Sequence, residues 1–131
     1  MRLLLDTHIA VLAIADHPNL AAKARTLIND PDNEIVVSAA TIWEIAIKHA
    51  LARGSANGMP ISGDAALGFF REAGFDMLDI SPTHAAAVES LASLHDDPFD
   101  RLLVAQAMTV PLRLVTHDQK IAAYSDSVIL G

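Results

Sequence analysis

The sequence predicts an α/β fold: a three-layer α/β/α domain with a central, mainly parallel β-sheet. Short apolar stretches of strand character alternate along the chain with longer stretches of helical character. Strands that alternate with helices in this way form a parallel sheet covered on both faces. The 131 residues contain no repeat, low-complexity tract or linker, and they are enough to bury one core, so we expect a single domain over residues 1–131.

In the first half of the chain, local stop signals separate five expected elements. Asp30-Pro31-Asp32-Asn33 is a strong turn signal, and Arg53-Gly54 places a basic residue and a glycine where a helix should end. Ser38 precedes the longest helix and can cap it. In chain order, we expect a strand at 2–5, helices at 9–15 and 20–29, a strand at 35–37 and a helix at 39–53.

The second half continues the same alternation after a loop at residues 55–63. Ser81-Pro82 places proline at a first helical position, and His95-Asp96-Asp97-Pro98 and Pro111 are breaks. In chain order, we expect a helix at 64–73, a strand at 75–80, helices at 81–94 and 99–110, a strand at 112–115, a short helix at 116–124 and a strand at 127–130.

Composition narrows the class of protein. The net charge of −7 argues against a general nucleic-acid-binding surface, although bound divalent metal would neutralise part of it. Cysteine is absent, which excludes disulfides and thiolate metal sites. The most apolar stretch, 35–52, contains Glu44 and Lys48, and no signal-peptide pattern opens the chain. We therefore expect a soluble, cytoplasmic protein without a membrane span.

Four acids stand at comparable points of the predicted fold. Asp6 and Asp118 follow the first and fourth strands, while Glu44 and Asp100 lie on helices. Ligand sites of open α/β sheets form beyond the carboxyl ends of the strands. Crowded carboxylates repel unless a cation enters, and hard oxygen ligands without thiolate select Mg²⁺ or Mn²⁺. Such ions can activate water and stabilise the hydrolysis of a phosphodiester.

Two of these acids have a purely structural alternative. Asp6 can cap the helix that follows it. Glu44 can pair with Lys48 at i,i+4 on a solvated face, worth about 0.2–0.5 kcal/mol. Apolar neighbours surround Glu44 on nearly all sides, however, so we expect a largely buried helix in which this carboxylate needs a partner or a metal.

The other two acids stand where helices begin. Asp97 can be an N-cap, with Asp100 returning to it as in a capping box. Thr116 can cap the next helix, with Gln119 closing the box and Asp118 favoured by the helix dipole. A helix start also keeps a carboxylate charged, so structural and metal-binding roles can coexist.

The histidines give a weaker signal than the acids. His17, His49, His84 and His95 share no close ligand spacing, so we expect them to be surface or packing residues. His8 is expected to orient or pack rather than to bind metal.

Four motifs, taken together, closely resemble the PIN-domain family, most nearly the VapC-type toxins of prokaryotic toxin–antitoxin pairs. They are Asp6-Thr7-His8, residues 38–48, residues 95–107 and residues 114–118. The resemblance covers essentially the whole chain in the right order, and the Asp-Pro-Phe-Asp-Arg block at 97–101 is highly specific. It implies a metal-dependent endoribonuclease, a hydrolase that cuts RNA phosphodiester bonds with metal-activated water.

The resemblance also implies site residues and partners. The catalytic, metal-binding quartet would be Asp6, Glu44, Asp100 and Asp118, around Mg²⁺ or Mn²⁺. The supporting positions would be Thr7, Ser38 and Thr116, with Asp97 as a cap or an outer residue and Arg101 orienting Asp100 or touching phosphate. The expected partners are RNA, a small cognate antitoxin and a second copy in a homodimer.

Two surface roles depend on this implied function. Apolar residues near Trp43 and Phe69-Phe70 are candidates for an interface, with a buried core as the equally economical explanation. The candidates for RNA phosphate contacts are Lys48, Arg53, Arg71, Arg101 and Lys120.

Three alternatives stay open at this point. A receiver-like signalling domain would need paired acids after the first strand, where Asp6 stands alone. A metal-dependent DNA nuclease of the flap type would share the acidic site. An inert metal-binding interaction module would bind the ion without turnover.

Overall fold

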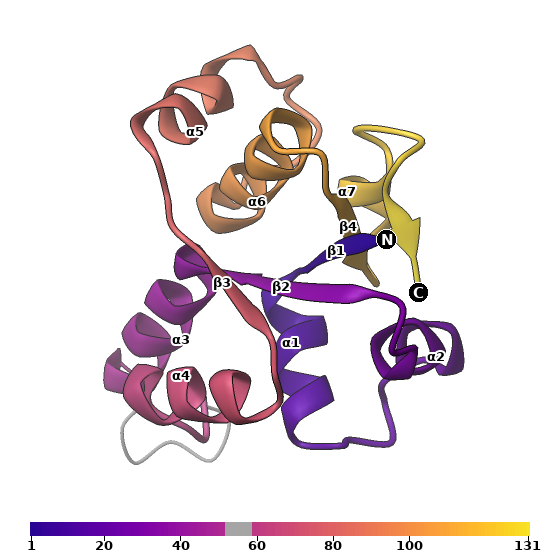
Figure 1. The fold of residues 1–131 in the computed structure, drawn as a ribbon. Coiled ribbons are helices and arrows are strands. Elements are labelled where there is room, and N and C mark those ends of the chain that lie inside the picture. Colours follow the sequence, from indigo (N-terminus) through magenta and orange to yellow (C-terminus); the bar gives the residue numbers. More distant parts are fainter. Residues whose placement is uncertain (52–58) are drawn as a thin grey trace.

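The central feature of the fold is one parallel β-sheet, seen in a computed structural model that describes residues 1–51 and 59–131. The strand order is β3-β2-β1-β4-β5, and each neighbouring pair is parallel (Figure 1). The strands are β1 (Arg2–Leu5), β2 (Glu34–Ser38), β3 (Asp76–Leu78), β4 (Arg113–Thr116) and β5 (Ile129–Leu130). The predicted three-layer α/β fold is confirmed, and its sheet is entirely parallel.

The middle strand, β1, divides the core into two apolar clusters. Leu3, Leu4 and Leu5 are fully buried, as expected for a strand that pairs on both edges and is covered on both faces. Successive side chains of a strand point to opposite faces. Accordingly, Leu3 and Leu5 belong to one cluster and Leu4 belongs to the other.

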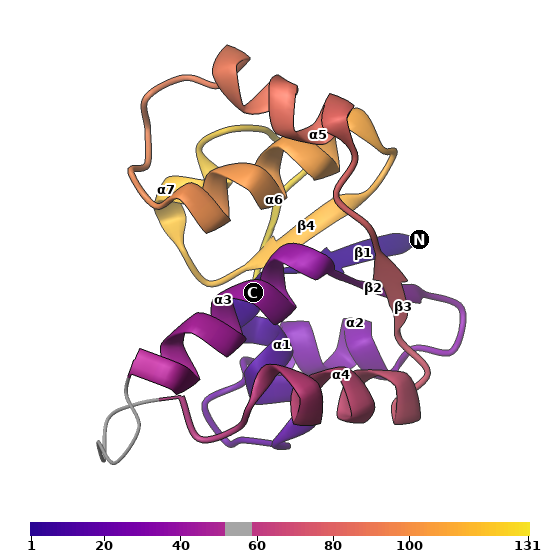
Figure 2. The same ribbon diagram turned by 90° about the vertical axis from the view of Figure 1, so that its left-hand side faces the viewer.

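The helices cover the two faces of the sheet (Figures 1 and 2). Below the sheet in Figure 1 lie α1 (Thr7–Ile14), α2 (Ala22–Asn29), α3 (Ala39–Leu51) and α4 (Gly63–Glu72). On the other side lie α5 (Pro82–Ala87), the 3₁₀ turn η1 (Val88–Ser90), α6 (Pro98–Thr109) and the short α7 (Gln119–Ala122). Among the described residues, none of the helices is both long and apolar enough to span a bilayer.

Most expected elements are present, with shifted ends. The stop at Gly74 is confirmed, because this glycine adopts a φ of 83° just after α4. The first helix begins at Thr7, two residues earlier than expected, since Asp6 caps it. The stop expected at Arg53-Gly54 and residues 55–58 of the loop expected at 55–63 lie outside the described residues.

Two helix predictions were wrong. The α-helix expected at 81–94 ends at Ala87 and tightens into the 3₁₀ turn Val88–Ser90, in which the Leu91 N–H donates to Val88 O. Arg101 also binds the carbonyls of Val88 and Ala92, where the chain turns away from the helix axis. The helix expected from Thr116 begins only at Gln119. Thr116 instead completes β4, where it pairs with Leu130 of β5.

Candidate functional site

A pocket of about 520 Å³ lies where the carboxyl ends of the central strands meet the helices that follow them. Sequence reasoning singled out acids on four elements, and the structure places all of them around this one pocket. Its carboxylates come from Asp6, Glu44, Asp97, Asp100 and Asp118. Adjacent parallel pairing of β1 and β4 brings the distant ends of the chain together, and the backbone N–H of Asp6 donates to Val115 O at 3.0 Å.

Asp6 has both the structural and the pocket-lining role that its position allows. Its Oδ1 accepts from the backbone N–H of Ile9 at 2.8 Å, which caps α1, and its Oδ2 accepts from the Thr116 hydroxyl. Burial raises the pKa of Asp6, although these two hydrogen bonds oppose the shift. A buried carboxyl held from two sides is fixed in orientation toward the pocket.

Asp118, rather than Thr116, caps the helix after β4. Its Oδ1 accepts from the backbone N–H of Lys120 at 2.8 Å, while the Thr116 hydroxyl accepts from the backbone N–H of Asp118 at 3.0 Å. The expected cap at Thr116 and box closure by Gln119 were therefore wrong, because α7 starts later. Partial burial acts to raise the pKa of Asp118, but hydrogen bonds from Lys120 N and from His95 outweigh it and lower that pKa.

Glu44 is buried on α3, with 5% of its surface exposed. Its Oε2 pairs with Lys48 Nζ at 2.5 Å, and this hydrogen bond raises the pKa of Lys48. Its Oε1 has no hydrogen-bond partner among the residues that the structure describes. The i,i+4 pair therefore exists, yet it leaves one buried carboxylate oxygen without a donor in the described part of the chain.

The expected reason for the burial of Glu44 was wrong. Trp43, beside it on α3, is 55% exposed and meets Phe99 edge-on with ring centroids 5.0 Å apart. Glu44 is buried instead because α3 packs against α1, α4 and α6, and this side of the helix turns inward.

Asp97 caps α6 as expected, but the capping box does not form. Asp97 Oδ1 accepts from the backbone N–H groups of Phe99 at 2.8 Å and Asp100 at 3.1 Å. In a box, the Asp100 side chain would accept from the Asp97 N–H. That N–H donates instead to His95 Nδ1 at 3.0 Å, so the carboxylate of Asp100 faces the pocket.

Asp100 has the most perturbed environment of the set. Burial, then the charges of Asp97, Asp6 and Glu44, raise the pKa of Asp100 to about 7, and His95 opposes this shift. Near neutral pH Asp100 is therefore partly protonated, whereas an aspartate side chain in water would be ionised. This is the electrostatic signature of carboxylates gathered to a density that favours a cation.

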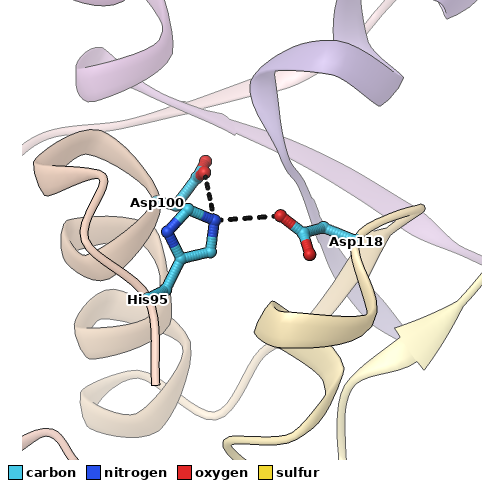
Figure 3. A group of neighbouring side chains, drawn as sticks. All are labelled: His95, Asp100 and Asp118. Carbon is cyan, nitrogen blue, oxygen red and sulfur yellow. Dashed lines mark hydrogen bonds and ion pairs between the residues drawn. The ribbon is translucent and has the colours of Figure 1, made fainter. Parts of the chain in front are cut away.

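His95 joins the acids, against the expectation that it is a surface or packing residue. Its Nε2 lies 2.9 Å from Asp118 Oδ2 and 3.2 Å from Asp100 Oδ2 (Figure 3). One ligand-type atom from each of these three residues lies within 4.8 Å of the others. The spacing of histidines in the sequence did not indicate this role, because His95 meets Asp100 and Asp118 through the folding of a loop and not along one helix. The signal in the sequence was its place at the head of the acidic block at 95–100.

The expected supporting residues divide into two groups. Thr7 lines the pocket, and its hydroxyl lies 3.1 Å from that of Thr41. Ser38 does not line it: its hydroxyl is fully buried, accepts from Ala40 N and donates to Gln106 Oε1 at 2.6 Å. The structure therefore brings Thr7 and Thr116 to the acids and leaves Ser38 beneath α6.

Arg101 holds a loop instead of Asp100. Its guanidinium donates to the carbonyls of Val88, Ala92 and His95 and to the Tyr124 hydroxyl. Among the described residues it makes no ion pair with Asp100, so the expected orienting contact was wrong.

The other basic residues proposed for RNA phosphate contacts differ in whether they line the pocket. Lys48 lines it, whereas Arg71 and Lys120 are exposed and do not. Arg53 lies outside the described residues.

The side chains of this pocket fit a hard divalent cation. They supply oxygen donors from several elements, one of which, Glu44 Oε1, is buried without a partner in the described part of the chain. The raised pKa of Asp100 has the same origin, an excess of negative charge that a cation would offset.

Comparison with known proteins agrees with this architecture. The PIN domain model matches residues 3–126. The chain resembles VapBC2 from Rickettsia felis, solved with a promoter DNA fragment, at 21% identity over 100% of this chain and 98% of that one, with a TM-score of 0.70. It also resembles DNA-bound VapBC from Salmonella typhimurium, with a TM-score of 0.68, and VapBC-1 from nontypeable Haemophilus influenzae, with a TM-score of 0.64. In both comparisons the identity is 18%, over 98% of this chain and 96% of the other. No curated protein matches the chain.

Proposed function

The chain belongs to the PIN-domain family, and we propose that it is a metal-dependent endoribonuclease, the toxin of a type II toxin–antitoxin pair. The observation that carries the proposal is the convergence of five carboxylates on one pocket, strong enough to hold the pKa of Asp100 at about 7. Such a pocket suits a divalent cation that activates water for phosphodiester hydrolysis, a reaction that needs no covalent nucleophile from the protein.

Asp6, Glu44, Asp100 and Asp118 would hold the cation, Mg²⁺ or Mn²⁺. When bound, the ion lowers the pKa of a coordinated water and offsets charge on the phosphodiester. The protein contributes orientation: the Ile9 N–H and the Thr116 hydroxyl hold the Asp6 carboxylate from two sides.

Among the described residues, Lys48 is the lysine or arginine that lines this pocket and would meet an RNA phosphate there. It lines the pocket, its side chain is half exposed, and it is tethered at 2.5 Å to Glu44. Arg71 and Lys120 are exposed candidates for contacts with RNA beyond the pocket. With so few cations, binding should weaken with salt but with a modest slope.

The partners belong to the same proposal. The structural neighbours are complexes of VapB with VapC, and by analogy a small antitoxin would bind this chain. Trp43 and Phe69, both exposed and apolar, are candidates for contacts with that antitoxin or with a second copy in a homodimer.

The test is cleavage of a mixed structured RNA pool by the purified chain, freed of any partner, with a single-stranded and flap DNA set in parallel. Reactions contain Mg²⁺, Mn²⁺ or chelator. Asp6→Asn is the diagnostic variant, because its amide oxygen can still cap α1 while the ligand charge is lost. Asp32→Asn, which removes an exposed carboxylate in a turn, is the matched control.

Metal-dependent cutting of RNA that Asp6→Asn loses and Asp32→Asn retains is the expected result. Equal cutting by all three proteins would contradict the assignment and indicate contamination or another site. Cleavage of DNA but not of RNA would indicate a metal-dependent DNA nuclease instead. Bound metal without any turnover would favour an inert interaction module.

A further inference from the structure

His95 joins two carboxylates that reach the pocket from different parts of the fold. Asp100 lies in the first turn of α6, while Asp118 follows β4 and caps α7. In Figure 3 both carboxylates face the same ring nitrogen of His95. This nitrogen, Nε2, lies 3.2 Å from Asp100 Oδ2 and 2.9 Å from Asp118 Oδ2. The His95 side chain is 15% exposed, so the ring is largely shielded from water, whereas the Asp118 side chain is 38% exposed.

The other ring nitrogen determines where the proton of His95 resides. The backbone N–H of Asp97 lies 3.0 Å from Nδ1, and an amide N–H can only donate. Nδ1 must therefore accept, and a neutral imidazole that accepts at Nδ1 carries its hydrogen on Nε2. Nε2–H is then a donor to Asp118 Oδ2 and lies 3.2 Å from Asp100 Oδ2, and the protonated nitrogen has no lone pair for a metal.

The backbone of His95 is held in place as well. Its N–H donates to the Tyr124 hydroxyl at 3.1 Å, and its carbonyl accepts from Arg101 at 3.4 Å. Arg101 also donates to the Tyr124 hydroxyl at 3.2 Å. The ring is thus presented to the acids by a loop that α6 and the segment after α7 fix together.

We propose that His95 is a positioning residue: its Nε2–H holds Asp100 and Asp118 at a fixed spacing for the cation, and His95 does not bind the cation itself. This inference rests on the proposed metal site. The competing role, His95 as a third ligand, requires the hydrogen to move to Nδ1, where it would face the Asp97 N–H. The two roles therefore differ in the location of one hydrogen.

Two variants and a matched control separate these roles in the full chain. His95→Ala removes the donor, whereas His95→Gln retains an N–H on a side chain of similar reach. His17→Ala is the control, because His17 Nδ1 accepts from Asn19 N at 3.0 Å in the same kind of local turn. His17 is exposed and has no carboxylate contact in the described part of the chain.

Two measurements are made that do not depend on activity. The first is Mn²⁺ affinity by titration calorimetry, with far-UV circular dichroism to verify folding. Loss of an outer hydrogen-bond partner commonly weakens metal binding by about 10–100-fold, which is the loss expected for His95→Ala. His95→Gln should recover most of the affinity, and His17→Ala should equal wild type.

The second measurement is the ¹⁵N spectrum of the His95 ring in wild type during a Mg²⁺ titration. The expected result is hydrogen on Nε2 both without metal and at saturation. Hydrogen on Nδ1 at saturation would overturn the proposal in favour of a ligand role, as would wild-type Mn²⁺ affinity in a folded His95→Ala. If His95→Ala does not fold, the spectrum and the affinity of His95→Gln decide.

Failure of the proposed function looks different. Wild type that binds no Mn²⁺ would overturn the metal site, and with it the role of His95 in arranging that site. Wild type that binds Mn²⁺ while His95→Ala binds it equally would overturn the role of His95 alone.

Discussion

Replacing Asp100 by Asn should stabilise the metal-free protein above about pH 7. In wild type, burial and the charges of Asp97, Asp6 and Glu44 hold the pKa of Asp100 at about 7. Ionising this carboxyl in the folded state therefore costs free energy that the unfolded chain does not lose. The asparagine amide has nearly the same shape and carries no charge, so it avoids that cost.

The magnitude follows from the shift. From 3.8 to about 7 is about three pKa units, or about 4 kcal/mol at about 1.4 kcal/mol per unit. The Asp100 side chain is 21% exposed and Asp97 is also partly exposed, so solvent screening reduces this to an expected gain of about 1–2 kcal/mol.

The sign of the pH dependence is equally specific. Between about pH 4 and about pH 7 the folded protein binds more protons at Asp100 than the unfolded chain does, so this group makes stability fall as pH rises. Above about pH 7 its contribution is constant. Asp100→Asn lacks this contribution, and its advantage over wild type should therefore grow from about pH 5 to about pH 8.

Urea unfolding in chelator at about pH 5 and about pH 8 measures this advantage, with Asp32→Asn as the exposed-carboxylate control. Adding Mn²⁺ at about pH 8 should stabilise wild type and leave Asp100→Asn nearly unchanged, since ligand binding stabilises only the state that binds. An Asp100→Asn variant less stable than wild type at about pH 8, or an advantage equal at both pH values, would refute the electrostatic reasoning.

Three further predictions concern the scaffold. Gly63→Ala should destabilise the protein by about 1–3 kcal/mol, because the new Cβ would lie 2.9 Å from Ala46 Cβ. Gly68→Ala, also on α4, places its Cβ in open space and should stabilise the protein by about 0.5–1 kcal/mol. Thermal unfolding of the two variants compares these effects. Gln106→Leu should cost about 2–4 kcal/mol in urea unfolding, because it orphans the buried partners of a fully buried amide. Arg101→Lys should speed amide hydrogen exchange in the loop before α6, because one ammonium cannot serve four acceptors; unchanged protection would contradict this.

Features that depend on near neighbours were readable from the sequence. The apolar run of β1, the β-branched residues of β2 and the alternation with helices predicted a parallel sheet covered on both faces. Asp6 and Asp97 were recognised as possible caps, because capping depends on residues two or three positions away. The motifs also identified the family, since they preserve residue type and order along the chain.

Errors arose where a side chain outside a local pattern competes with it. The helix expected at 81–94 gives way at Val88 to a 3₁₀ turn, and Arg101, on another helix, binds the carbonyls of Val88 and Ala92 where the chain leaves the helical path. The capping box at 97–100 does not form because His95 takes the backbone N–H of Asp97. In both cases a side chain outside the pattern forms a hydrogen bond with a backbone group that the pattern involves.

The sequence by itself determined the fold class and which acids could serve a site. Only the tertiary structure decided that Asp6 and Asp118 line one pocket, because parallel pairing of β1 with β4 closes a separation of more than 100 residues. It also decided that His95 lies between Asp100 and Asp118, a position set by the Tyr124 and Arg101 contacts of its loop. Periodicity and capping are local properties of a chain, whereas the charge density of this pocket depends on distances that exist only after the sheet has formed.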